Sequence, residues 1–229
     1  MKKELQLIEN DHASRMKEIL DDAWEIFKWQ FVHQTFNTEI NSEAGFQFYF
    51  ASIIKNIGEM LALNDEVFFL EVETKWNTDS ENGNERIDIT CGFKKGAKKV
   101  YACAIELKFF KDGHNSTHNL FSAYEDLYAL EKRVLACGEE GITQYSQGRF
   151  YLVAGSPDYR NNPAYKTKTD DFPKFGFNNG VTVKYVKYRE SKTRPSIELR
   201  FKKEYEVCWS PKNKNENSKW HFLEIDITK

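Results

Sequence analysis

Apolar residues recur along the chain with a period that changes several times. Near the N-terminus they return every third or fourth position, which predicts a helix over 12–36. The same period predicts a second helix that begins after Asn41 or Ser42 and runs to about 63, and a third helix over 117–137 that ends at Gly138. Each of these segments is expected to bury one face against a core.

Elsewhere the apolar period shortens to two, which is typical of β-strands. The segments with this pattern are, in chain order, 66–76, 85–93, 99–109, 149–155, 181–188, 196–209 and 219–227. Residues 156–180 have the composition of a loop, and 210–218 that of an exposed turn. Helices, a hairpin, a helix, a strand and a β-rich end predict one mixed α/β domain over 1–229.

The composition narrows the class of protein. The 229 residues are 40% hydrophobic and 15% aromatic, which suffices for a sizeable core, and the net charge of −2 excludes a uniformly basic nucleic-acid binder. Basic residues gather over 181–214. This segment is either a surface that meets a polyanion or a solvated face of a sheet.

Four cysteines form no C-x-x-C pair, so neither a zinc site nor a redox motif is indicated. The N-terminal residues resemble no signal peptide, and no segment has the length and hydropathy of a membrane span. We therefore expect a soluble protein of the reducing cytoplasm, with no membrane partner. No P-loop or dinucleotide fingerprint is present, so no nucleotide cofactor is expected.

The hairpin over 85–109 carries charges within otherwise apolar strands. Its turn signal is "KKGAK", and a turn centred on Ala97 pairs residues whose numbers sum to about 194. This register places Asp88 opposite Glu106. By the same rule, Ile89 lies opposite Ile105, and Phe93 lies opposite Tyr101.

Because side chains alternate between the two faces of a strand, the register sorts the hairpin into two faces. The odd-numbered face is apolar and should be core: Ile87, Ile89, Cys91, Phe93, Tyr101, Cys103, Ile105, Leu107 and Phe109. The even-numbered face holds the charges with small residues beside them: Arg86, Asp88, Thr90, Ala102, Ala104, Glu106 and Lys108.

Two carboxylates opposite each other cost free energy unless a positive charge lies between them. Carboxylate oxygens suit Mg²⁺ or Mn²⁺, so Asp88 and Glu106 are candidate metal ligands, with Lys108 in reach of a metal-bound water or a phosphate. The alternative is an exposed sheet face with a weak Glu106–Lys108 ion pair. The apolar residues around them favour a buried central strand, and hence the metal site.

At this point the residues resemble a known family. "RID" followed by "AIELKF" is similar to the motif of the PD-(D/E)XK nuclease superfamily, in which an Asp begins the second core strand and Glu-x-Lys lies on the third. Asp88, Glu106 and Lys108 match those positions, while Ile87 stands where the proline of the name would be. The order of elements over about 41–155 is also similar.

The superfamily often carries another acid on the helix before the sheet, and Glu43 in "NSEAGFQ" is the best match. The other interpretation of Glu43 is an acid that favours the helix dipole. The resemblance implies a restriction-endonuclease-like mixed β-sheet flanked by helices. The helix over 12–36 and a β-rich C-terminal extension over 181–229 lie outside the matching core.

The resemblance also implies Mg²⁺-dependent hydrolysis of DNA phosphodiesters, by an endonuclease of restriction or defence. Asp88 and Glu106 would hold one or two Mg²⁺ ions, with Mn²⁺ as a substitute, and the carbonyl of Leu107 would join them. Lys108 would orient or deprotonate the attacking water. Two alternatives stay open: a catalytically silent nucleic-acid-binding or interaction module of the same fold, and a nuclease that acts on RNA. A homodimer that cuts both strands is also open.

Weaker candidates for nucleic-acid contacts lie around this motif: Arg86, His114, His118, Arg160, Lys166 and Lys168. For Arg86 we favour an ion pair with Glu71 or Glu73 on the neighbouring strand. Glu125 and Asp126 are not assigned a catalytic role, because exposed acids of the third helix would explain them as well. Cys91 and Cys103 are expected to face each other as small buried residues.

Overall fold

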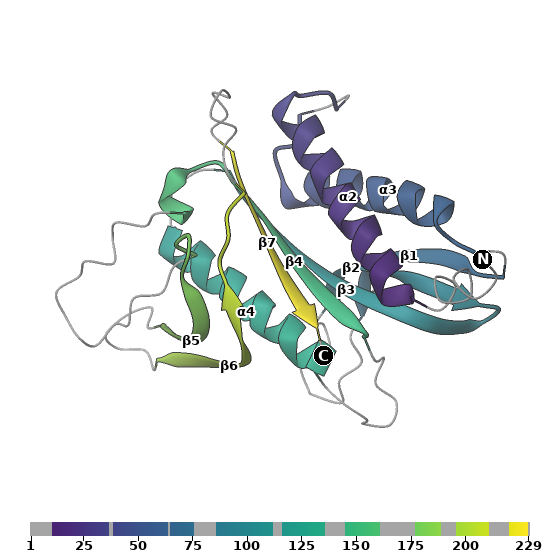
Figure 1. The fold of residues 1–229 in the computed structure, drawn as a ribbon. Coiled ribbons are helices and arrows are strands. Elements are labelled where there is room, and N and C mark those ends of the chain that lie inside the picture. The colour runs from purple at the N-terminus through teal and green to yellow at the C-terminus, as the bar shows by residue number, and fades with distance from the viewer. Residues whose placement is uncertain are drawn as a thin grey trace. The chain divides into compact units, whose positions relative to one another are not determined.

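The computed structural model describes residues 11–36, 39–63, 65–75, 86–111, 116–135, 145–160, 177–188, 196–210 and 220–228. Within them the protein is mixed α/β: a five-stranded mixed sheet of order β1-β2-β3-β4-β7, a two-stranded sheet β5-β6, and three α-helices. Figure 1 shows these elements along the chain. The predicted mixed α/β class is confirmed.

The elements follow the predicted order. The helices are α2 (His12–Val32), α3 (Glu43–Met60) and α4 (Ser116–Leu135), with a short 3-10 helix η1 (Pro157–Tyr159). The strands are β1 (Val67–Lys75), β2 (Arg86–Lys95), β3 (Lys98–Phe110), β4 (Gln147–Ala154), β5 (Thr182–Tyr188), β6 (Ile197–Glu206) and β7 (His221–Thr228). Each predicted helix and strand is present. Most of the predicted turn over 210–218 lies outside the described residues.

The chain divides into two compact units. The first comprises residues 1–105, 134–148 and 228–229, and the second comprises 106–133 and 149–227. No helix of the described residues has the length and apolarity needed to cross a membrane.

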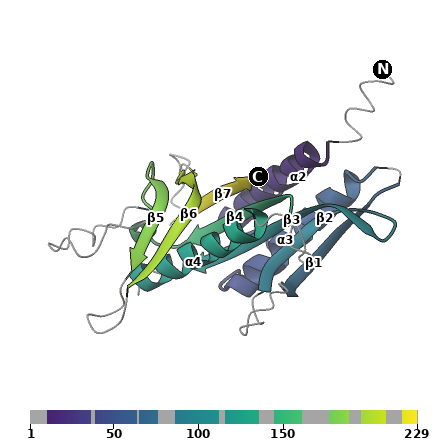
Figure 2. The ribbon, with the colours of Figure 1, turned by 90° about the horizontal axis from the view of Figure 1, so that it is seen from below.

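In the first unit, α2 and α3 pack side by side and α3 packs on β1 and β2, as Figures 1 and 2 show. Side-chain oxygens cap both helices: Asp11 accepts from the N–H of Ser14, and Ser42 accepts from that of Gly45. An aromatic cluster fills the interface, and its members are fully or almost fully buried: Trp24, Phe27, Phe46 and Phe50. The rings of Phe27 and Phe46 lie 4.7 Å apart.

The first helix ends four residues before the predicted limit, at Val32. His33 closes it, and Gln34 then takes a positive φ of 52°, which a helix cannot continue. Phe36 lies beyond the helix, yet its ring packs at a tilt against that of Phe27, with the ring centroids 5.7 Å apart. The apolar period therefore overstated the length of this helix by four residues.

Close backbone approach explains two glycines of the first unit. A Cβ at Gly92 would lie 2.0 Å from the carbonyl oxygen of Tyr101 on the paired strand, and a Cβ at Gly58 would lie 2.4 Å from the ring of Phe68. No larger side chain fits at either position without movement of its neighbour. These glycines bring β2 against β3 and α3 against β1.

In the second unit, the β5–β6 hairpin packs on α4 (Figure 2). Phe201 contacts the rings of Tyr124 and Tyr128. The β5–β6 register passes from Tyr185–Arg200 to Val183–Tyr205, so the residues between Arg200 and Tyr205 bulge out of the ladder.

The side chain of Glu131 on α4 binds this bulge. Glu131 is 1% exposed and accepts the backbone N–H groups of Lys202 and Lys203, each at 2.9 Å. The hydroxyl of Tyr205 donates to the same carboxylate at 2.9 Å. Burial, this hydrogen bond and the charge of Glu131 all raise the pKa of Tyr205. A single carboxylate thus joins the hairpin to α4.

Candidate active site

The hairpin that carries the predicted site pairs as expected over most of its length. Ile89 pairs with Ile105, Cys91 with Cys103, and Phe93 with Tyr101. Cys91 and Cys103 are free, buried thiols, as predicted. The hydrogen bond with Cys103 and burial raise the pKa of the Cys91 thiol.

The turn of the hairpin differs from the prediction by one residue. A β-bulge lies between Phe93 and Lys94, after which Lys94 pairs with Lys99 and Lys95 with Lys98. The turn is therefore Gly96–Ala97 and is not centred on Ala97. Gly96 has a φ of 58°, a left-handed conformation that glycine adopts without strain.

The odd-numbered face of the hairpin is core, as predicted. Its residues from Ile87 to Phe93 and from Cys103 to Leu107 are fully buried, whereas Tyr101 and Phe109 are only half-buried. The even-numbered face is also buried at Thr90, Ala102 and Ala104. The strands thus have little solvent contact on either face, which makes their charges costly without partners.

Asp88 is half-buried on β2, and α3 reaches its backbone. The Nε2 of Gln47 donates to the carbonyl of Asp88 at 2.8 Å and to Oε1 of Glu73 at 3.1 Å. Glu73 lies across from Asp88 in the β1–β2 ladder, because its neighbours in β1 pair with Ile89 and Ile87. Its φ of 52° is unusual for a non-glycine residue. Gln47 therefore spans an irregular point of the β1–β2 ladder.

Glu43 is the first residue of α3, directly after the capping Ser42. It precedes Gln47 by four residues, so the two lie on one side of the helix. Both interpretations of Glu43 fit this position, because the first turn of a helix also favours an acid electrostatically. Its catalytic assignment stays a prediction.

Glu106 lies in the middle of β3 and is 5% exposed. Its Oε1 accepts from Nη1 of Arg133 on α4, which is itself 5% exposed. The following residue, Leu107, is fully buried. Arg133 was not predicted from the sequence as a partner of Glu106.

Lys108 also pairs with α4. Its Nζ lies 2.5 Å from Oδ2 of Asp126, and the two side chains are 16% and 33% exposed. Asp126 is therefore a half-buried acid with a basic partner on β3. Because Asp126 and Arg133 are seven residues apart, they lie on one helix face, as Glu106 and Lys108 lie on one strand face. This matching period was the signal in the sequence that would have found the partners.

The weaker candidates have different outcomes. Arg86 lies 3.9 Å from the Glu73 carboxylate, the ion pair that we favoured, with both side chains about half exposed. His118 is exposed on α4, and Arg160 is half-buried after η1. His114, Lys166 and Lys168 lie outside the described residues.

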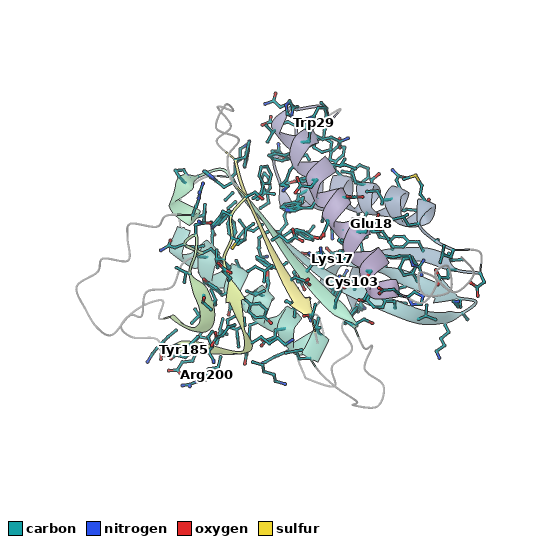
Figure 3. The ribbon with its side chains drawn as sticks, viewed as in Figure 1. Lys17, Glu18, Trp29, Cys103, Tyr185 and Arg200 are labelled. Carbon is teal, nitrogen blue, oxygen red and sulfur yellow. The ribbon has the colours of Figure 1, made fainter. Side chains whose placement is uncertain are left out.

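The basic segment near the C-terminus carries its own counter-charges. Lys184 pairs with Glu204 at 2.8 Å, and Arg200 pairs with Glu198 at 3.1 Å. Figure 3 labels Tyr185 and Arg200 on this hairpin, where the guanidinium lies 5.0 Å from the ring centroid. The outer face of β5–β6 thus has the character of a solvated sheet face.

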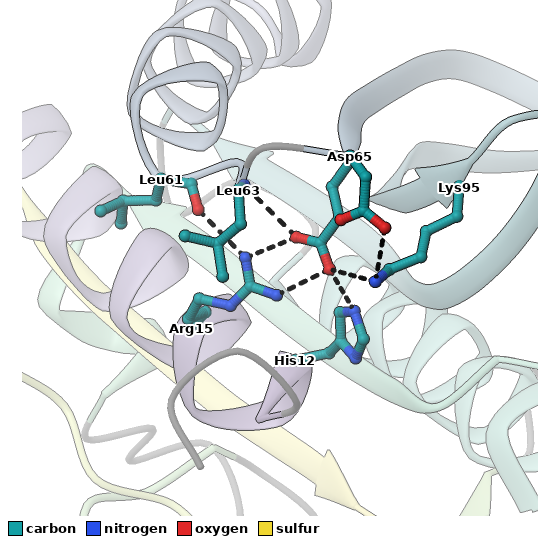
Figure 4. Close-up of polar contacts among 7 residues, drawn as sticks. His12, Arg15, Leu61, Leu63, Asp65 and Lys95 are labelled. Carbon is teal, nitrogen blue, oxygen red and sulfur yellow. Dashed lines mark hydrogen bonds and ion pairs between the residues drawn. The ribbon is translucent and has the colours of Figure 1, made fainter. Parts of the chain in front are cut away.

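A second buried carboxylate, Glu66, was not singled out from the sequence (Figure 4). Arg15 donates to it through both Nη atoms, at 2.7 and 3.1 Å, and Nε2 of His12 lies 2.8 Å from Oε1. The N–H of Leu63 also points to it at 3.4 Å, while Arg15 donates to the carbonyl of Leu61 at 3.1 Å. This cluster ties the start of α2 to the turn between α3 and β1.

The electrostatics of Glu66 fit a structural role. Burial acts to raise the pKa of this carboxyl, but hydrogen bonds from Arg15 and His12 and the charge of Arg15 outweigh it and lower the pKa to about 2. Glu66 is therefore ionised at any ordinary pH. The ring of Phe93 lies 4.4 Å from the guanidinium carbon of Arg15 and covers the cluster.

Within the described residues, no three His, Cys, Asp or Glu side chains form a group that could hold a metal ion. Comparison of the chain with protein-family models, with curated proteins and with solved structures found no match.

Proposed function

We propose that this protein is a metal-dependent nuclease that hydrolyses phosphodiester bonds of DNA. The observation that carries the proposal is the buried charge of Glu106, followed by half-buried Lys108, within a 13-residue strand where apolar side chains would cost less. The register supports it too. The observed pair Ile89–Ile105 agrees with the register from which the sequence predicts Asp88 opposite Glu106.

The donor atoms suit the proposed cation. The carboxylates of Asp88 and Glu106 and the carbonyl of Leu107 offer only oxygen, which Mg²⁺ and Mn²⁺ prefer. A divalent cation there would offset the negative charge that develops on the phosphoryl oxygens and would lower the pKa of a bound water. Because Arg133 already binds Oε1 of Glu106, the cation would share that carboxylate with the guanidinium or displace it.

The chain's own residues have distinct roles in this proposal. Lys108, held by Asp126, would contact the scissile phosphate and orient the attacking water. Gln47 would fix the backbone of Asp88, since its amide donates to that carbonyl. Glu43 would add a further carboxylate from the first turn of α3.

The experiment compares cleavage of plasmid and single-stranded DNA with Mg²⁺ or Mn²⁺. Wild type should cleave, whereas Asp88→Ala and Lys108→Ala should not. Asp21→Ala and Lys132→Ala are the matched controls, because each removes a side chain of the same type from a helix and leaves the proposed site intact. Equal cleavage by wild type and both site variants would refute the assignment.

One observation favours a second candidate, a catalytically silent nucleic-acid-binding module of this fold. The guanidinium of Arg133 supplies the positive charge that Glu106 needs, without any metal. Calorimetric titration with Mn²⁺ separates the two candidates. Binding that is lost in Asp88→Ala supports the nuclease, and no binding by wild type together with no cleavage supports the silent module.

The finer assignments belong to the same proposal. The restriction-endonuclease-like type of the fold is supported by the order of elements from α3 to β4. A reducing, cytoplasmic setting is supported by the free thiols of Cys91 and Cys103 at paired positions. RNA in place of DNA, and a homodimer, are alternatives that cleavage assays on both polymers and sedimentation would decide.

A further inference from the structure

The tip of the β2–β3 hairpin carries four lysines within six residues. Two of them, Lys94 and Lys99, are directly paired across the ladder after the bulge, and so are Lys95 and Lys98. Like charges at directly opposed positions repel each other. The sequence has nevertheless placed two such pairs in one turn.

Lys94 and Lys99 are held together on one face of the sheet. Their Nζ atoms lie 4.5 and 4.6 Å from the centroid of the Phe69 ring. Both also reach Glu71, at 3.4 and 3.0 Å. Partial burial acts to raise the pKa of Glu71, but contacts with Lys99 and Lys94 lower it. Glu71 and the aromatic ring thus fix two ammonium groups beside each other.

One carboxylate offsets only one of these two charges. On the opposite face, Lys95 lies 3.1 Å from Asp65 and Lys98 is exposed, so the tip as a whole is positive. The side chains of Lys94 and Lys99 are about one-third exposed, so their ammonium groups remain accessible to an anion from solution. A phosphate diester suits an ammonium pair with a single positive charge in excess.

The register relates this pair to the proposed active site within the first unit. In the β1–β2 ladder, Val67 pairs with Lys94 and Glu71 pairs with Thr90. Even-numbered residues of β2 therefore share one face, which includes both Lys94 and Asp88. Six residues of strand separate them, or about 20 Å at roughly 3.3 Å per residue. That span equals about six base pairs of duplex DNA.

We propose that Lys94 and Lys99 form a phosphate-binding site for the backbone of duplex DNA, about six base pairs from the phosphate at Asp88. This inference rests on the proposed nuclease function. The lysine pair binds phosphate without a divalent cation and without base specificity. It adds to the affinity for DNA and fixes the position of the protein on the duplex, and it takes no part in the hydrolysis.

The test is binding of a labelled 20-base-pair duplex by the full chain, by fluorescence anisotropy in EDTA at several salt concentrations. For the double variant Lys94→Ala and Lys99→Ala, the slope of log K against log salt should fall by about 0.9, the value for the one phosphate that the pair contacts. Its affinity near 0.1 M salt should fall on the order of 10-fold or more. The matched control removes Lys17 and Lys55, two exposed lysines of α2 and α3 that also have acidic partners.

Glu71→Gln tests the site in the opposite direction. It removes the carboxylate that competes for both ammonium groups, so binding should tighten severalfold and the salt slope should steepen. Misfolding of a variant cannot produce tighter binding. No tightening, or an equal loss in the Lys17 and Lys55 control, would overturn the inference, as would an absence of wild-type binding in EDTA.

The outcomes for this inference and for the proposed function are separable. Cleavage by wild type with an unchanged salt slope in the double variant would overturn the lysine pair and leave the nuclease standing. Salt-dependent binding through Lys94 and Lys99 without cleavage would support the pair and refute the nuclease. Preference for duplex RNA of equal length would overturn the assignment to DNA.

Discussion

Two buried carboxylates, Glu66 in the first unit and Glu106 in the second, each bind a buried arginine, yet their settings differ. Glu66 lies at the junction of two elements, where its cluster also satisfies the N–H of Leu63 and, through Arg15, the carbonyl of Leu61. Glu106 lies in the middle of a strand and pairs with Arg133 side chain to side chain. Burial of a charge alone therefore does not identify a functional residue, whereas the groups that the charge satisfies are informative.

The largest expected effect comes from removing each carboxylate and then its arginine. Glu66→Leu and Glu106→Leu should each lower the free energy of unfolding by about 3–5 kcal/mol, because an unpaired guanidinium stays buried. Adding Arg133→Leu to Glu106→Leu should recover most of that loss, since two apolar side chains replace an ion pair. Urea denaturation followed by circular dichroism measures both.

Adding Arg15→Leu to Glu66→Leu should recover much less. The N–H of Leu63 has already lost its partner in Glu66→Leu, and the added Arg15→Leu also removes the donor to the carbonyl of Leu61, at a cost of about 1–3 kcal/mol when buried. Equal recovery in the two double variants would contradict the comparison.

The pH dependence of stability gives the next effect. The folded pKa of Glu66 is about 2, below its ordinary value of 4.5, so its contribution is fully present above pH 4.5 and is lost as pH falls toward 2. The loss amounts to about 3 kcal/mol. The free energy of unfolding of wild type should fall as the pH is lowered through this window, whereas that of Glu66→Gln should fall less. Parallel curves for the two proteins would show that Glu66 is not the group that titrates.

A smaller effect on stability, with a larger one on activity, is expected at Lys108. Its ion pair with Asp126 is partly exposed, so Lys108→Met should change the free energy of unfolding by no more than about 1 kcal/mol. Cleavage of DNA should fall by about 100-fold or more, as is usual when a group that stabilises the transition state is removed. A loss of stability as large as that in Glu66→Leu, with cleavage retained, would assign Lys108 to structure.

The smallest effect is expected at Arg86. Its contact with Glu73 is 3.9 Å long and half exposed, so Arg86→Ala should change stability by about 0.5 kcal/mol or less. A thermal denaturation curve indistinguishable from wild type is the expected result. A loss of stability as large as that expected for the buried ion pairs would show that exposure does not predict how much the Arg86–Glu73 contact contributes.

The register of the hairpin was predictable because the period-two pattern and Gly96 restrict the alignment of the strands. The bulge after Phe93 was not, because it depends on how Lys94 and Lys99 settle against Phe69 and Glu71 of another strand. The Glu66 cluster escaped prediction for a similar reason. Its members come from α2, the end of α3 and the hairpin, and no local period connects them.

The partners of Glu106 and Lys108 were more predictable from the sequence than the Glu66 cluster and less predictable than the register of the hairpin. Asp126 and Arg133 repeat at a spacing of seven on a helix, as the two strand residues repeat at a spacing of two. Matching the helix period with the strand period would have paired Arg133 with Glu106 and Asp126 with Lys108. What sequence alone lacked was the evidence that α4 packs with its polar residues toward β3.

The contacts of Glu131 have a consequence for the dynamics of the hairpin. The amide protons of Lys202 and Lys203 are bound to a buried side chain of α4, although they lie in a bulge of the β5–β6 ladder. Hydrogen exchange at these two positions therefore requires the hairpin to separate from the helix. Their protection factors measure the free energy of that local opening, independently of the global unfolding of the chain.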